Sequence, residues 1–172
     1  MACVWLYYGT RLAQSIYCWL KLSKRNKTYE RAKKRRTGGA FIPLPCRVLD
    51  HPAYIRLSTK AVKLLLDMCK QLHFKEGGPV NNGDISIAWK IMGSRGWHSK
   101  ETLRQAEIEL LDSGFISKTR QGGRNKCNLY AVTWWAIDEC KGKLDVKPTA
   151  VPPDNWVTCQ LAETDWVTLK SY

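Results

Sequence analysis

The stretch ISIAWKIMGSRGWHSKETLRQAEIELLDSGFISKTR, residues 85–120, carries the pattern that decides the expected fold. Ser86 is expected to cap a short helix over residues 87–92, which stops at Gly93. A turn over residues 94–97 separates that helix from a second one, which Ser99 caps. Two helices joined by a tight turn predict a helix-turn-helix unit.

The residues after Ser99 have the spacing of an amphipathic helix. Glu101 lies in the first turn, where the helix dipole favours an acidic side chain. Gly114 stands where a helix commonly ends in a left-handed residue. The helix is expected to bury one apolar stripe, made of Leu103, Ala106, Leu110 and Leu111.

The flanking segments complete a familiar order of elements. Toward the C-terminus, residues 115–120 and 127–134 predict two strands joined by a glycine-rich hairpin loop over residues 121–125. Toward the N-terminus, Ser58 is expected to cap a buried helix that ends near Phe74, and Ile85 contributes a very short strand. The expected fold class is α+β, a winged helix-turn-helix with three helices and a small antiparallel β wing.

The chain divides into three parts. Residues 1–38 form an aromatic and basic N-terminal extension, residues 39–142 the winged helix-turn-helix domain, and residues 143–172 an irregular linker and Trp-containing tail. In that tail the string NWVT at 155–158 is echoed by DWVT at 165–168. Three interpretations stay open for it: a short hairpin, docking on a protein partner, or packing of its tryptophans on the domain.

The N-terminal extension also leaves alternatives open. Residues 1–22 fit an amphipathic docking helix, a weak interfacial anchor, or an extension from a start codon that is not the natural one, which is the favoured reading. The basic run at 21–36 fits either an arm along phosphates or a solvated linker. The uncharged stretches are too short to span a bilayer, so a membrane-spanning helix is not expected. A membrane is not the expected partner, and peripheral attachment through residues 1–36 is a third hypothesis after DNA binding and protein binding.

The net charge of +13 and a pI near 9.6 indicate an anionic partner, with nucleic acid as the first choice. The charge is uneven, because residues 1–50 carry 11 Lys and Arg against two acidic residues, and residues 51–140 carry 13 against nine. The basicity of the whole chain is therefore weaker evidence about the domain than about its N-terminal extension.

The residues do not form an enzyme signature. The seven cysteines are scattered without a C-x-x-C pair, which favours reduced thiols in a cytoplasmic protein. His51, His73 and His98 lack the spacing of metal ligands, and there is no P-loop and no G-x-S-x-G. The expectation is a protein without catalysis, metal or cofactor.

Several motifs resemble small winged helix-turn-helix proteins of prophages and related mobile elements. The likeness covers about residues 41–142 and rests on FIPLP at 41–45, VLDHPAY at 48–54, NNGDIS at 81–86, GFI at 114–116, TRQGG at 119–123 and CNLYAVTW at 127–134. The resemblance implies the winged-helix fold and DNA binding, and some proteins of this kind resemble the DNA-binding part of replication initiators. The expected function is sequence-specific or semi-specific binding of double-stranded DNA, in replication initiation or transcription control. It leaves the choice between these roles open.

A DNA-reading helix needs hydrogen-bond donors near its N-terminal end. Arg104 and Gln105 have the reach and the geometry to contact guanine and adenine edges. Other residues are better placed for phosphates, namely Arg95, Ser99, Lys100 and Thr102. The alternative is a solvated polar helix face.

The wing supplies a second group of candidates. Its glycines, Gly122 and Gly123, allow close approach to a nucleic-acid backbone. The candidates for contact with DNA are Arg120, Arg124, Asn125 and Lys126. The alternative is a hairpin made soluble by charge.

Two further expectations concern partners and tryptophans. A homodimer that reads two half-sites is compatible with the sequence, as is the rival hypothesis of a winged-helix module that binds proteins and owes any DNA affinity to the basic arm. A helix face broken by Glu101, Glu107 and Asp112 would favour that rival. Core or hinge packing, rather than stacking on bases, is expected for Trp89, Trp97, Trp134 and Trp135.

Overall fold

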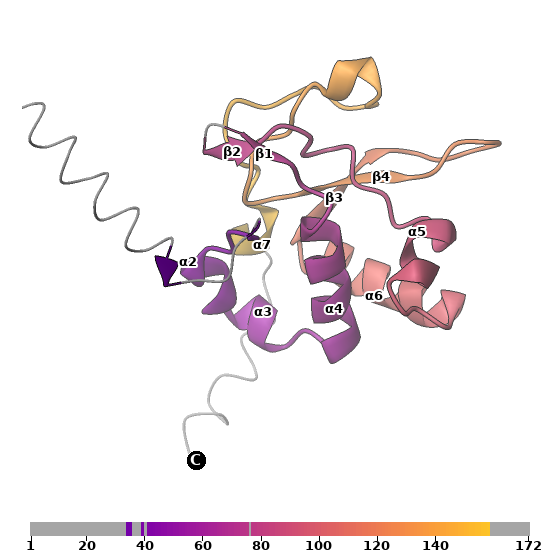
Figure 1. The fold of residues 1–172 in the computed structure, drawn as a ribbon, viewed down its shortest axis with the longest axis horizontal. Helices are drawn as coiled ribbons and strands as arrows, with labels where there is room; N and C mark the ends of the chain where they lie inside the picture. The colour runs from indigo at the N-terminus through magenta and orange to yellow at the C-terminus, as the bar shows by residue number, and fades with distance from the viewer. Residues whose placement is uncertain (1–33, 36–38, 40, 76, 159–172) are drawn as a thin grey trace, which may run out of the picture. The chain divides into compact units, whose positions relative to one another are not determined.

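The computed structural model describes residues 34–35, 39, 41–75 and 77–158 (Figure 1). The chain separates into two compact units, residues 1–41 and 42–172, and almost all of the described residues belong to the second. The expectations for the segments 1–22 and 21–33 and for the second tryptophan string at 165–168 lie outside the described residues. The second unit combines helices with two small antiparallel sheets, so the α+β class is confirmed.

Three helices form the middle of this unit: α4 (Thr59–Cys69), α5 (Trp89–Ser94) and α6 (Lys100–Asp112). The hydroxyl oxygen of Ser58 accepts from the backbone N–H of Ala61 at 3.2 Å, and that of Ser99 accepts from the N–H of Thr102 at 3.3 Å. Both predicted N-caps are therefore confirmed. Helix α4 packs against α6 through faces that contain Leu64, Leu65, Leu103 and Leu110, all buried.

The predicted start of the middle helix was wrong by two residues. The Ser86 hydroxyl accepts from the N–H of Ala88 at 3.2 Å, which closes a turn before the helix instead of capping it. Ala88 is the N-cap residue, with an extended backbone, and α5 begins at Trp89.

Helix α4 is also shorter than predicted, because it ends at Cys69 and not near Phe74. The loop side chain of Asn81 accepts from the backbone N–H of His73 at 2.7 Å and donates to the carbonyl oxygen of Gln71 at 2.9 Å. These bonds divert the backbone from the helix. The chain then forms an unpredicted two-stranded sheet, β1 (Phe74–Lys75) with β2 (Gly78–Pro79).

The second sheet is the predicted hairpin. Strand β3 (Ile116–Arg120) pairs antiparallel with β4 (Leu129–Val132), with Ile116 opposite Val132 and an irregularity between Lys118 and Arg120. Ile85 adds an isolated bridge to Tyr130, as the short-strand prediction required. Gly114, between α6 and β3, has the expected left-handed backbone with φ +75°.

Short helices at both ends of the unit were not predicted. Helices α2 (Cys46–Leu49) and α3 (Pro52–Ile55) precede α4, while η1 (Cys140–Gly142) and α7 (Asn155–Thr158) follow the hairpin. Helix α7 carries Trp156, which is buried in the same core as Phe115 and Leu110. Residues 143–158 therefore contribute a core side chain, Trp156. For this tryptophan, the prediction that the tail packs on the domain is confirmed.

Asn82 joins the loop after β2 to the segment that follows β4. Its buried amide donates to the carbonyl oxygens of Val132, Trp135 and Ala136 and accepts from the N–H of Val132, at 2.9–3.1 Å. Because these groups are removed from water, each bond also avoids the cost of an unsatisfied polar atom. The end of β4 and the segment after it are thereby held against the loop that follows β2.

Candidate nucleic-acid interface

The turn between α5 and α6 is anchored by Asp67 of α4. This carboxylate is 6% exposed and accepts from Lys63 Nζ at 2.7 Å, from Trp97 Nε1 at 2.9 Å and from Arg95 Nη2 at 2.7 Å. Burial of Asp67 opposes its ionisation, but the hydrogen bonds from Lys63, Trp97 and Arg95 outweigh that effect and hold its pKa below the ordinary value. The network fixes where α6 begins.

Arg95 has a structural role in this network. Its guanidinium donates to Asp67 Oδ1 from both Nε and Nη2, at 3.0 and 2.7 Å. Its side chain stays 42% exposed. The sequence analysis predicts phosphate contact for Arg95. It did not predict that Arg95 also anchors the turn between α5 and α6 through its hydrogen bonds to Asp67.

The N-terminus of α6 combines a cap with a cation. The Ser99 hydroxyl is committed to the Thr102 N–H as an acceptor. The Lys100 ammonium lies over the Trp89 ring of α5, 5.7 Å from the ring centroid. Trp89 is 38% exposed, so it is not a core residue and hinge packing is the alternative that remains for it, while Trp97 and Trp134 are buried as expected.

The two expected base-reading side chains share one partner, Glu101. Arg104 donates from Nε to Glu101 Oε2 at 3.1 Å and from Nη2 to Glu101 Oε1 at 3.0 Å. Gln105 Nε2 donates to the same Oε1 at 3.2 Å. The hydrogen bonds with Arg104 hold the pKa of the Glu101 carboxyl below its ordinary value. The structure thus brings Arg104 and Gln105 together, because both donate hydrogen bonds to the Glu101 carboxylate.

The β3–β4 hairpin is the most basic element near α6. Between residues 116 and 132 it carries four cationic side chains and no acidic one; the cations are Lys118, Arg120, Arg124 and Lys126. Arg120 differs from the others, because its Nη2 donates to the carbonyl oxygen of Cys127 at 3.1 Å, across the hairpin. Arg120 therefore braces the two strands.

The tip of the hairpin is a two-residue turn made of Arg124 and Asn125. Gly123 and Lys126 close it with two backbone hydrogen bonds, of 3.0 and 3.1 Å. Asn125 adopts φ +64°, a conformation that asparagine tolerates better than most residues. Among the described residues, no side-chain hydrogen bond or ion pair engages Arg124 or Lys126, both of which are exposed. Figure 1 shows this hairpin projecting away from the helices.

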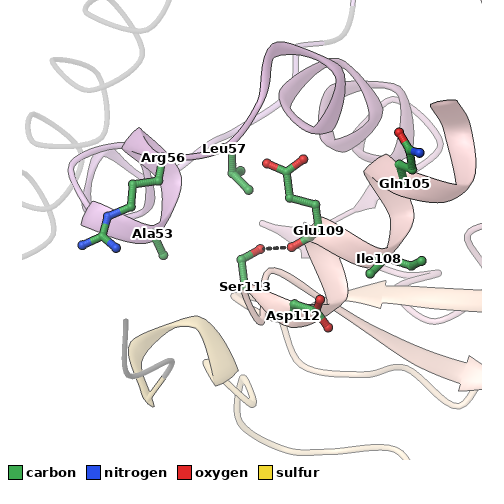
Figure 2. Close-up of a pocket in the computed structure, with 8 residues that line it drawn as sticks. All are labelled: Ala53, Arg56, Leu57, Gln105, Ile108, Glu109, Asp112 and Ser113. Carbon is green, nitrogen blue, oxygen red and sulfur yellow. Dashed lines mark hydrogen bonds between the residues drawn. The ribbon is translucent and has the colours of Figure 1, made fainter. Parts of the chain in front are cut away.

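A separate hollow of about 430 Å³ adjoins the C-terminal half of α6 (Figure 2). Its floor is mainly apolar, with Ala53, Leu57 and Ile108 among the lining residues. Glu109 closes one side by accepting from the N–H and hydroxyl of Ser58, both at 2.6 Å. Gln105, one of the two candidate base-reading residues, is among the residues that line this hollow.

Comparisons of the chain with family models, with curated proteins and with solved structures found no match. Within residues 41–75 and 77–158, no three His, Cys, Asp or Glu side chains gather in a way that could hold a metal ion. In the same ranges, every helix is too short or too polar to cross a membrane.

Proposed function

We propose that this chain is a double-stranded DNA-binding protein with a winged helix-turn-helix domain, in which α6 reads the major groove and the β3–β4 hairpin is the wing. The observation that carries the proposal is the hairpin itself, which has four cations, no acid and a tip formed by Arg124 and Asn125. Such a tip can approach phosphates or enter a minor groove.

The order of elements supports the same proposal. Helix α5, the turn anchored on Asp67, α6 and the hairpin follow one another as in a helix-turn-helix unit with a wing. The Lys100 ammonium and the N–H groups of the first turn of α6 other than that of Thr102, which binds Ser99, are suited to phosphate contact. The action is in replication initiation or transcription control, in keeping with the resemblance to proteins of prophages and mobile elements.

The acidic charge of α6 indicates that α6 and the β3–β4 hairpin contribute differently to DNA binding. Helix α6 carries two basic residues against four acidic ones, Glu101, Glu107, Glu109 and Asp112. Such a helix gains little from general attraction to phosphates. The hairpin therefore supplies most of the affinity of the domain, and α6 supplies contacts to bases.

Fluorescence anisotropy with a random-sequence duplex across a salt series tests the proposal. The full chain is compared with the double variant Arg124→Ala/Lys126→Ala, and Lys70→Ala, which removes an exposed lysine at the end of α4, is the control. The double variant is expected to bind more weakly, with a log–log salt slope shallower by about two, because two phosphate contacts are lost. Equal binding and slope in the double variant and the control would overturn the role of the hairpin.

A protein-interaction module is the second candidate. The observation that favours it is the apolar hollow beside the acidic C-terminal half of α6. If the full chain binds no duplex at low salt, or keeps its affinity in the double variant, this candidate gains support and any DNA affinity belongs to the basic arm.

A further inference from the structure

The contact between Glu101 and Arg104 uses one particular edge of the guanidinium group. The carboxylate oxygens meet Nε at 3.1 Å and Nη2 at 3.0 Å, which is the side edge of the group. A guanidinium has five N–H donors, and the end edge, formed by Nη1 and Nη2, has its own pair of parallel N–H bonds. Within the part of the chain that the structure describes, the hydrogen bonds of Arg104 are those from Nε and Nη2 to Glu101, and they leave the end edge for another partner.

The pair is placed where a partner can reach it. The side chains of Arg104 and Glu101 are 61% and 58% exposed. Gln105 adds a third donor to the same carboxylate at 3.2 Å, which restricts the motion of Glu101. A long side chain that is held before binding loses less conformational entropy when it binds.

The ligand that fits the end edge is a guanine. Its O6 and N7 atoms accept two parallel hydrogen bonds in the major groove, and arginine is the common partner for that pair. A phosphate would also fit a guanidinium fork, but the Glu101 carboxylate repels phosphate oxygens at close range. The acid therefore favours a base edge over the backbone.

We propose that Glu101 is a positioning residue that determines specificity: it holds Arg104 by the side edge so that the end edge reads a guanine in the DNA site. The inference rests on the proposed function, because it needs α6 in the major groove. It adds the class of target, a duplex with a G·C pair at the position that Arg104 meets. It also gives a role to an acid that otherwise weakens DNA binding.

Selection from a duplex library with a randomised centre tests the inference. The full chain, Glu101→Gln, Arg104→Lys and Glu139→Gln are each incubated with the library, and bound DNA is sequenced. Glu139→Gln is the matched control, because it removes the same charge from an exposed residue outside α6. Arg104→Lys keeps the positive charge but loses the planar fork. Thermal melting of each variant checks that folding is unchanged.

The wild type and Glu139→Gln are expected to enrich a guanine at one position. Glu101→Gln is expected to lose about tenfold of that preference while binding random duplex at least as tightly, and Arg104→Lys to lose the preference as well. A Glu101→Gln variant that binds all sequences more tightly with its preference intact would make Glu101 a repulsive charge only, and would overturn the inference.

Two other outcomes separate this inference from the proposed function. Wild-type binding to duplex without any preference for guanine overturns the inference and leaves duplex binding standing. No binding of the wild type to any duplex overturns both.

Discussion

The indole of Trp156 stacks on the phenyl ring of Phe115, with ring centroids 6.1 Å apart and ring planes 14° apart. Phe115 lies between α6 and β3, and Trp156 lies 41 residues later in α7. His51 adds an edge contact at 4.9 Å, and the Arg47 guanidinium lies 5.2 Å from the centre of the indole. One aromatic side chain therefore joins α2, the start of α3 and the end of α6.

Truncation of Trp156 is expected to destabilise the fold. Trp156→Ala should lower the free energy of unfolding by about 3–5 kcal/mol, because the indole is 2% exposed and its loss leaves a cavity. Urea denaturation followed by circular dichroism measures this. Val157→Ala, at a neighbouring side chain that is 41% exposed, should change it by less than about 1 kcal/mol. Equal effects of the two variants would show that α7 is not part of the core.

Gly114 is expected to be irreplaceable for two reasons. Its φ is +75°, and a Cβ atom there would lie 2.8 Å from backbone atoms of Asn155 and Trp156. Gly114→Ala should therefore lower the free energy of unfolding by more than about 1 kcal/mol, from backbone strain alone. Gly93→Ala is the matched control, because Gly93 lies within α5 with open space around it, and it should stabilise by about 0.5 kcal/mol. Differential scanning calorimetry compares them, and a neutral Gly114→Ala would contradict the docking of α7.

The Asp67 network predicts a pH dependence of stability. The pKa of Asp67 is lower in the folded state than its ordinary value of 3.8, so its carboxylate stabilises the fold at higher pH. That contribution is lost as the pH falls below about 3.8 through the folded-state pKa. Asp67→Asn should be less stable than the wild type at neutral pH by about 1–2 kcal/mol, and the difference should shrink in acid. Urea titrations at several pH values measure the difference in unfolding free energy between the two proteins. A difference that does not change with pH would show that it does not arise from the ionisation of Asp67.

Arg120 and Arg124 are expected to respond differently to the same substitution. Arg120→Ala removes the bonds to the Cys127 carbonyl and should lower the melting temperature. Arg124→Ala should leave the melting temperature unchanged and, under the proposed function, reduce the salt slope of DNA binding by about one. Thermal melting and anisotropy distinguish the two arginines. Equal melting temperatures for both variants would show that the bonds of Arg120 to Cys127 do not stabilise the hairpin.

The sequence predicted correctly those features that depend only on residues a few positions apart in the chain. The caps at Ser58 and Ser99 need only a side-chain oxygen and an N–H group three residues later. Gly114 ends α6 through its own backbone freedom. The strands of the hairpin follow from apolar runs on either side of a glycine-rich loop.

The same local reasoning could not find the short helices or the end of α4. Helices of four residues, such as α2 and α7, are unstable by themselves, because nucleation costs more than so few hydrogen bonds return. They exist through distant contacts, such as that of Trp156 with Phe115. The helix α4 stops at Cys69 because the side chain of Asn81, in a loop eight to ten residues further on, takes the N–H of His73 and the carbonyl oxygen of Gln71 that a longer helix would use.

The candidate site likewise has features that the sequence predicts and features that depend on the tertiary structure. The sequence by itself determined which residues carry charge and hydrogen-bond donors, and on which helix and hairpin they lie. Only the tertiary structure decided that Arg95 is bound to Asp67, because that bond joins residues 28 positions apart. Only the closed hairpin brings Arg120 to the carbonyl oxygen of Cys127. The pairing of Glu101 with Arg104 is local in spacing, but α4 and the hairpin bury the opposite side of α6 and so leave this pair facing solvent. Charge is a property of the residue, whereas its availability to a ligand depends on what the fold places beside it.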